Sequence, residues 1–173
     1  MTGLVQLDAL VKKEITQMQP VPGLQVQFHT YDSQPGKGTF DIKGSFNDAQ
    51  FAYSVCPHLG TRLALDKNGH KVQVTHNHNR IDAVQVNDER YYHPESALCD
   101  NADDPLVRPD IDRAIEFGGR AYSSVREHLD LQQPGLLKLI ARYYDRTLLP
   151  ADDRPSMSSC EEIFAQFDLR VKK

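Results

Sequence analysis

The chain has 173 residues, of which 39% are hydrophobic and 25% charged, and its formal net charge is −4. This length and composition are typical of one globular domain with its own core, which we expect to span residues 1–173. Mixed charges with an acidic excess disfavour nucleic-acid binding, and no stretch approaches the ~18–20 apolar residues of a membrane span.

The first predicted element is an amphipathic helix within residues 1–20. Apolar side chains recur at spacings of three and four residues, at Leu4, Leu7, Val11, Ile15 and Met18. The segment "QPVPG" follows at residues 19–23, and its prolines end the helix because they remove hydrogen-bond donors.

Residues 24–93 change to an alternating pattern that predicts antiparallel strands. Examples are "LQVQF", "GTFDIKGSF", "QFAYSV" and "IDAVQVND". The segments "RLAL" and "KVQV" flank Asn68-Gly69, a strong signal for a hairpin turn because both residues tolerate positive φ. "SQPGKG" at residues 33–38 is interpreted as another hairpin loop. We expect an antiparallel sheet of about six strands.

Residues 110–173 are predicted to be helical. Asp110 is the expected N-cap of one helix, and Gly118-Gly119 is expected to divide that helix in two. Pro134 is expected to start the next helix, and a capping-box pattern of Ser158 and Glu161 marks a last one. The chain is therefore predicted to be an α+β protein, with an N-terminal helix, a sheet and C-terminal helices packed on it.

The compartment is indicated by the cysteines and by the N-terminus. The chain has three cysteines, and its first residues lack a basic segment followed by an apolar one. An odd number of cysteines without a secretory signal favours reduced thiols and a cytoplasmic location.

One segment gathers residues that bind metals in other proteins. Cys56 and His58 lie in "CPHLG", and His76 and His78 lie in "VTHNH", on either side of the Asn68-Gly69 hairpin. Thiolate and imidazole side chains are the ligands that iron and zinc prefer.

This segment resembles the cluster-binding region of Rieske-type iron–sulfur proteins, over about residues 40–90. Cys56, His58 and Gly60 match the first C-x-H-x-G loop, and His78 falls at the histidine of the second loop. Thr75 stands where the family has its second cysteine, so an intact [2Fe–2S] cluster is not expected. The resemblance implies instead a single iron or zinc ion held by Cys56, His58 and His78, with His76 as a further ligand.

Several alternatives stay open for the same residues. His76 and His78 are also interpreted as polar residues at a strand end, and Cys56 as a small buried apolar residue. His76-x-His78 followed by Asp82 is similar to a cupin metal motif, with His93 as a later ligand. Cys56 beside His58 is a weaker candidate for a thiol nucleophile, since no orienting partner can be named.

The sequence thus predicts a small metal-binding or accessory protein more than an electron carrier or an enzyme. The alternative is a metal-free α+β module for protein–protein contact, with a partner protein or a second copy of the chain. A cupin-like metalloenzyme ranks below both, and no catalytic residue can be assigned.

Overall fold

The computed structural model describes residues 2–56, 60–77 and 80–148. Helix α1 (Thr2–Gln17) precedes the strands, and helices α2 (Arg108–Gln132) and α3 (Leu136–Leu148) follow them. The strands are β1 (Gln25–His29), β2 (Thr39–Phe46), β3 (Ala49–Cys56), β4 (Gly60–Lys67), β5 (His70–Asn77), β6 (Arg80–Val86) and β7 (Glu89–Tyr92). The predicted α+β order is confirmed, with seven strands in place of about six. None of the described helices is long and apolar enough to cross a membrane.

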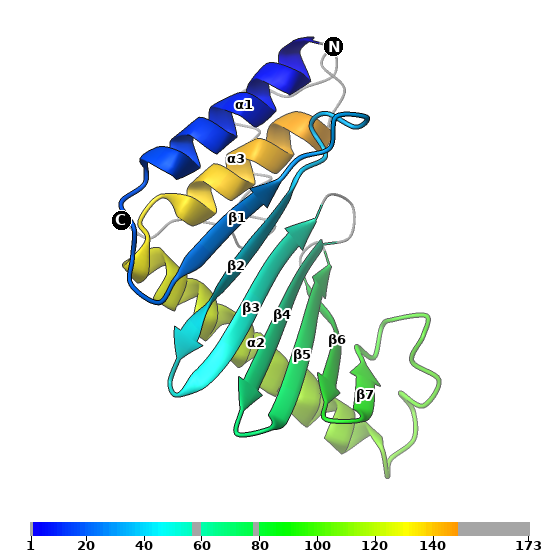
Figure 1. Ribbon diagram of the computed structural model, residues 1–173. Coiled ribbons are helices and arrows are strands. Elements are labelled where there is room, and N and C mark those ends of the chain that lie inside the picture. The colour runs from blue at the N-terminus through cyan, green and yellow to red at the C-terminus, as the bar shows by residue number, and fades with distance from the viewer. Residues whose placement is uncertain (1, 57–59, 78–79, 149–173) are drawn as a thin grey trace.

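The strands form a simple meander in which each strand pairs with its neighbours in sequence (Figure 1). All the pairs are antiparallel. The Asn68-Gly69 hairpin is confirmed, with φ of 56° and 86°, and the β2–β3 turn has Asn47 and Asp48 at 50° and 65°. Such positive φ angles are what tight hairpin turns between twisted strands require.

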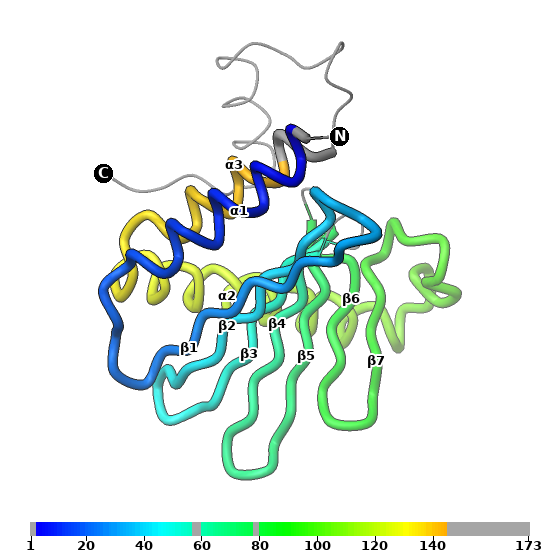
Figure 2. The backbone as a smooth tube through the Cα atoms, turned by 45° about the horizontal axis from the view of Figure 1, so that its top comes forward, coloured from blue at the N-terminus to red at the C-terminus, as the bar shows by residue number. Residues whose placement is uncertain are grey.

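All three described helices lie on one face of the sheet (Figure 2). α2 runs behind the strands and contacts β5, β6 and β7, whereas α1 and α3 lie beside each other near β1. We call this the covered face, and it carries the buried strand residues Phe40, Ile42, Phe51, Tyr53, Val55, Leu63, Val74 and Val84. Strand alternation sends the intervening side chains to the opposite, open face.

Helix α2 is continuous, so the predicted division at Gly118-Gly119 is wrong. Gly118 is buried against β6, where an added Cβ would lie 2.4 Å from Cγ2 of Val84. This glycine lets the helix approach the sheet closely, and the gain in packing offsets its low helix propensity.

The predicted N-cap at Asp110 is also wrong, because α2 begins at Arg108 with Val107 as its N-cap residue. Pro109 occupies the first turn, where its missing N–H costs nothing and its fixed φ suits a helix. Asp110 lies in that first turn and pairs with Arg113. Helix α3 begins at Leu136, two residues after Pro134, and the Ser158–Glu161 pattern lies outside the described residues.

A buried polar network fastens the β1–β2 loop to α1 and α3. The Tyr143 hydroxyl donates to Oδ1 of Asp8 at 2.7 Å, and the other carboxylate oxygen accepts from the Gly36 N–H at 2.9 Å. The Gly38 N–H donates to the Tyr143 hydroxyl oxygen, and the Tyr144 hydroxyl lies within hydrogen-bond distance of the Gly38 carbonyl. Since each buried polar group has a partner, this network stabilises the corner where helices meet sheet.

Candidate functional sites

Cys56 is the last residue of β3 and is half-buried. Alternation along the strand places it on the open face with Ser54, because Val55 between them is buried on the covered face. Its thiol lies near the charges of Asp41 and Arg62.

His76 lies on the covered face near the end of β5. It is 8% exposed, and its imidazole stacks on the Tyr122 ring of α2 with centroids 4.6 Å apart and planes 3° from parallel. The Arg126 guanidinium lies 5.5 Å from the centroid of the same Tyr122 ring. These contacts give His76 a packing role between sheet and helix.

Cys56 and His76 therefore lie on opposite faces of the sheet, so the structure does not bring them together as ligands of one ion. His58 and His78 lie outside the described residues, so their convergence with Cys56 stays a prediction. Within the part of the chain that the structure describes, no three His, Cys, Asp or Glu side chains group in a way that could hold a metal.

The surroundings of Cys56 do not activate it as a nucleophile. Burial raises the pKa of its thiol, the Asp41 carboxylate raises it further, and Arg62 opposes that rise. Since the thiolate is the reactive form, a raised pKa keeps Cys56 protonated at neutral pH. The raised pKa of Cys56 therefore does not support the prediction that it is a nucleophile.

Two buried tyrosine hydroxyls lie between the sheet and α2. Tyr53 and Tyr122 are almost fully buried and their rings stack with centroids 6.0 Å apart. Neither hydroxyl oxygen has a hydrogen bond of good geometry among the described residues, although the Tyr53 hydroxyl lies close enough to Tyr122 and Thr61 for a weak interaction. Burial raises the pKa of Tyr53 well above its ordinary value, and the neighbouring Tyr122 adds to the rise. Tyr53 therefore stays neutral, and both rings are part of the core.

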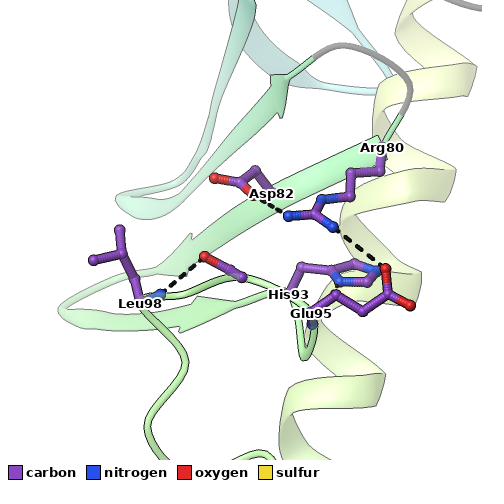
Figure 3. Close-up of polar contacts among 6 residues, drawn as sticks. Arg80, Asp82, His93, Glu95 and Leu98 are labelled. Carbon is purple, nitrogen blue, oxygen red and sulfur yellow. Dashed lines mark hydrogen bonds and ion pairs between the residues drawn. The ribbon is translucent and has the colours of Figure 1, made fainter.

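Asp82 and His93, the further residues of the cupin-like reading, belong to a surface network (Figure 3). Arg80 bridges the Asp82 and Glu95 carboxylates, at 3.3 Å from each. Nδ1 of the His93 ring accepts a hydrogen bond from the backbone N–H of Glu95, and the backbone N–H of His93 donates to the backbone carbonyl of Asp82. This network connects the segment after β7 to β6. Arg80 also offsets the charge of Asp82, the carboxylate that the cupin-like motif predicts as a metal ligand.

No described helix covers the open face of the sheet (Figure 1). Its side chains form cross-strand rows, because residues directly opposite each other point the same way. The middle row is Gln25, Lys43, Ala52, Ala64, Gln73, Gln85 and Arg90. One flanking row is Ser45, Gln50, Asp66 and Lys71, and the other is Gln27, Asp41, Ser54, Arg62, Thr75, Ala83 and Tyr92.

A hollow of about 490 Å³ lies in the middle of this face. Ala52 and Ala64 form its floor, because they are direct cross-strand partners and their side chains end at Cβ. Longer side chains from the same and the neighbouring row stand around them, namely Lys43, Gln50, Asp66, Lys71, Gln73 and Gln85. The hollow has the size of a binding pocket for one large side chain or small molecule.

The sequence alone does not predict the hollow, although Ala52 lies in "QFAYSV" and Ala64 in "RLALD". Strand alternation alone indicates that Ala52 and Ala64 face away from the core. Their meeting requires the β3–β4 register, in which Ala52 pairs with Ala64.

A scan of protein-family models, a search of curated proteins and a search of solved structures each gave no match to this chain.

Proposed function

We propose that this protein is a binding module that takes a segment of a partner protein on the open face of its sheet. The observation that carries the proposal is the hollow over Ala52 and Ala64, at the centre of a sheet face that no described helix covers. A concave spot within a broad exposed surface is where a partner side chain buries most area.

The polar rim suits reversible contact with a partner. Gln50, Gln73 and Gln85 offer both donors and acceptors, while the alanine floor offers apolar surface. A polar rim around a small apolar centre is the usual anatomy of a protein–protein interface.

The test is a selection of peptides of about nine residues, displayed as a random library, on the full-length chain. Ala64→Ile is the matched variant, since it fills the hollow and a β-branched residue suits a strand. Ala9→Ile adds the same side chain to the exposed side of α1 and serves as the control.

The proposal expects enriched peptides that bind the wild-type and Ala9→Ile chains equally and the Ala64→Ile chain at least about tenfold more weakly. Circular dichroism melts verify that all three chains are folded. Peptides that bind Ala64→Ile as tightly as wild type, or a library without enriched binders, would overturn the proposal.

A second candidate function is the binding of one iron or zinc ion by Cys56, His58 and His78. Cys56 pairs with Gly60, and Asn77 pairs with Arg80. The strands that flank residues 57–59 and 78–79 therefore end at the same edge of the sheet, along the strand direction, and this favours the candidate. Metal analysis of anaerobically purified protein tests it. Near-stoichiometric metal that is lost in Cys56→Ala supports this candidate, and metal-free wild-type protein contradicts it.

A further inference from the structure

The three cross-strand rows of the open face carry more positive than negative charge, although the whole chain is acidic. The cations are Lys43, Arg62, Lys71 and Arg90, and the carboxylates are Asp41 and Asp66. These rows therefore carry two more positive than negative charges, whereas the whole chain has a net charge of −4. Positive charge is thus concentrated on the open face.

The two carboxylates of these rows already have partners within the chain. Asp41 lies 3.0 Å from Nε2 of His29 and accepts from the Ser54 hydroxyl at 2.8 Å. Asp66 accepts from the Gly69 N–H in the adjacent hairpin turn. Their negative charge is thus partly offset by local donors.

The two lysines that line the hollow form no ion pair with another described residue, although Lys71 lies directly across from Asp66 in the β4–β5 register. Lys43, Arg62 and Lys71 are exposed, and Arg62 likewise forms no ion pair with another described residue. Lys43 and Lys71 stand on opposite sides of the alanine floor, on β2 and β5. Three strand spacings separate those strands, and Lys71 lies two residues along β5 from the row that contains Lys43, so the Cα atoms of the two lysines are about 16 Å apart.

Resting on the proposed function, we propose that the partner segment is acidic and carries one large apolar side chain that fills the hollow between Lys43 and Lys71. An extended segment covers about 16 Å with roughly five residues, so two acidic side chains, one on either side of the apolar one, span the distance between the two lysines. Complementary charge sets the orientation and speeds the encounter, while the buried side chain supplies the affinity.

The test uses peptides that bind the wild-type chain and are blocked by Ala64→Ile, since these occupy the hollow whatever their charge. Their composition is compared with that of the unselected library. Binding is then measured by fluorescence anisotropy to wild type, to Lys43→Glu/Lys71→Glu and to Lys12→Glu/Lys13→Glu. The last variant makes the same change of charge on exposed residues of α1.

We expect the selected peptides to contain more Asp and Glu than the unselected library, placed around one aromatic or branched apolar residue. We also expect their affinity to fall at least about tenfold in Lys43→Glu/Lys71→Glu, to change little in the α1 variant and to weaken with added salt. Hollow-binding peptides that are neutral or basic, or insensitive to the Lys43/Lys71 reversal, overturn this inference while the binding module stands. Failure of the module itself has a different signature, because no peptide is then sensitive to Ala64→Ile.

Discussion

The imidazole of His76 stacks face to face on the ring of Tyr122, and this contact joins strand β5 to helix α2 across the core. The contact gives His76 a role in packing. A residue that sequence spacing assigns to a metal is held on the covered face, away from Cys56 on the open one.

His76→Ala is expected to lower the free energy of unfolding by about 2–4 kcal/mol, because it removes a buried aromatic side chain and the stacked pair. Urea denaturation measures the change. His70→Ala, an exposed position in the β4–β5 hairpin, is the control and should leave stability nearly unchanged. A cost no larger than that of the control would contradict a packing role for His76.

Tyr53→Phe and Tyr143→Phe remove the same hydroxyl group and are expected to shift stability in opposite directions. The Tyr53 hydroxyl has no hydrogen bond of good geometry among the described residues and only weak interactions with Tyr122 and Thr61, so its removal relieves a poorly paired buried group and stabilises by up to about 1 kcal/mol. The Tyr143 hydroxyl bonds to Asp8 and to the Gly38 N–H, so its removal costs about 1–3 kcal/mol. Matched denaturation curves of the two variants measure both signs, and equal losses of stability would refute the assignment.

Stability is expected to decline in alkaline solution above about pH 10. Burial raises the pKa of Tyr53, Tyr143 and Tyr144 in the folded chain, so these phenols stay protonated there after their unfolded counterparts ionise. The unfolded chain then binds fewer protons than the native one, and the free energy of unfolding falls as pH rises. This contribution is fully present below the unfolded pKa and is lost as the pH climbs towards the folded one.

Urea melts at a series of pH values from about 8 upwards measure this decline. Tyr144→Phe removes one of the three groups and should give a shallower slope than wild type. A free energy of unfolding that stays constant beyond pH 10, or an unchanged slope in the variant, is the contrary result.

Gly118→Ala and Gly119→Ala test the close approach of α2 to the sheet with one methyl group at two adjacent positions. The added Cβ at Gly118 would clash with Val84, whereas at Gly119 the nearest atom outside the helix is 4.0 Å away. We expect Gly118→Ala to destabilise by about 1–3 kcal/mol and Gly119→Ala to stabilise by up to about 1 kcal/mol. Thermal melts of both variants give the comparison, and a stabilised Gly118→Ala would mean that α2 packs differently.

Much of the fold follows from short-range patterns in the sequence. Alternation predicts the strands, and Asn68-Gly69 predicts its hairpin because the positive φ angles are local requirements. The continuity of α2 could not be predicted, because the glycine pair that suggests a break is needed for contact with Val84 on a distant strand. Tertiary packing there overrides local propensity.

The candidate sites were harder to predict because they depend on which face and which register each residue takes. Spacing alone groups Cys56 with His76, but alternation from the buried Val55 and Val74 places them on opposite faces. The hollow depends on Ala52 meeting Ala64 across two strands, and a list of single residues does not contain that pairing. The hollow arises from strand register more than from any motif.

The most direct test of the binding-module account is amide chemical-shift mapping of the full-length chain with a peptide from the selection. If the peptide binds in the hollow, the largest amide shifts are expected at Ala52, Ala64 and Gln73, with smaller shifts at Lys43 and Lys71. Perturbations centred on the exposed side of α2, with the open face unchanged, would contradict the account.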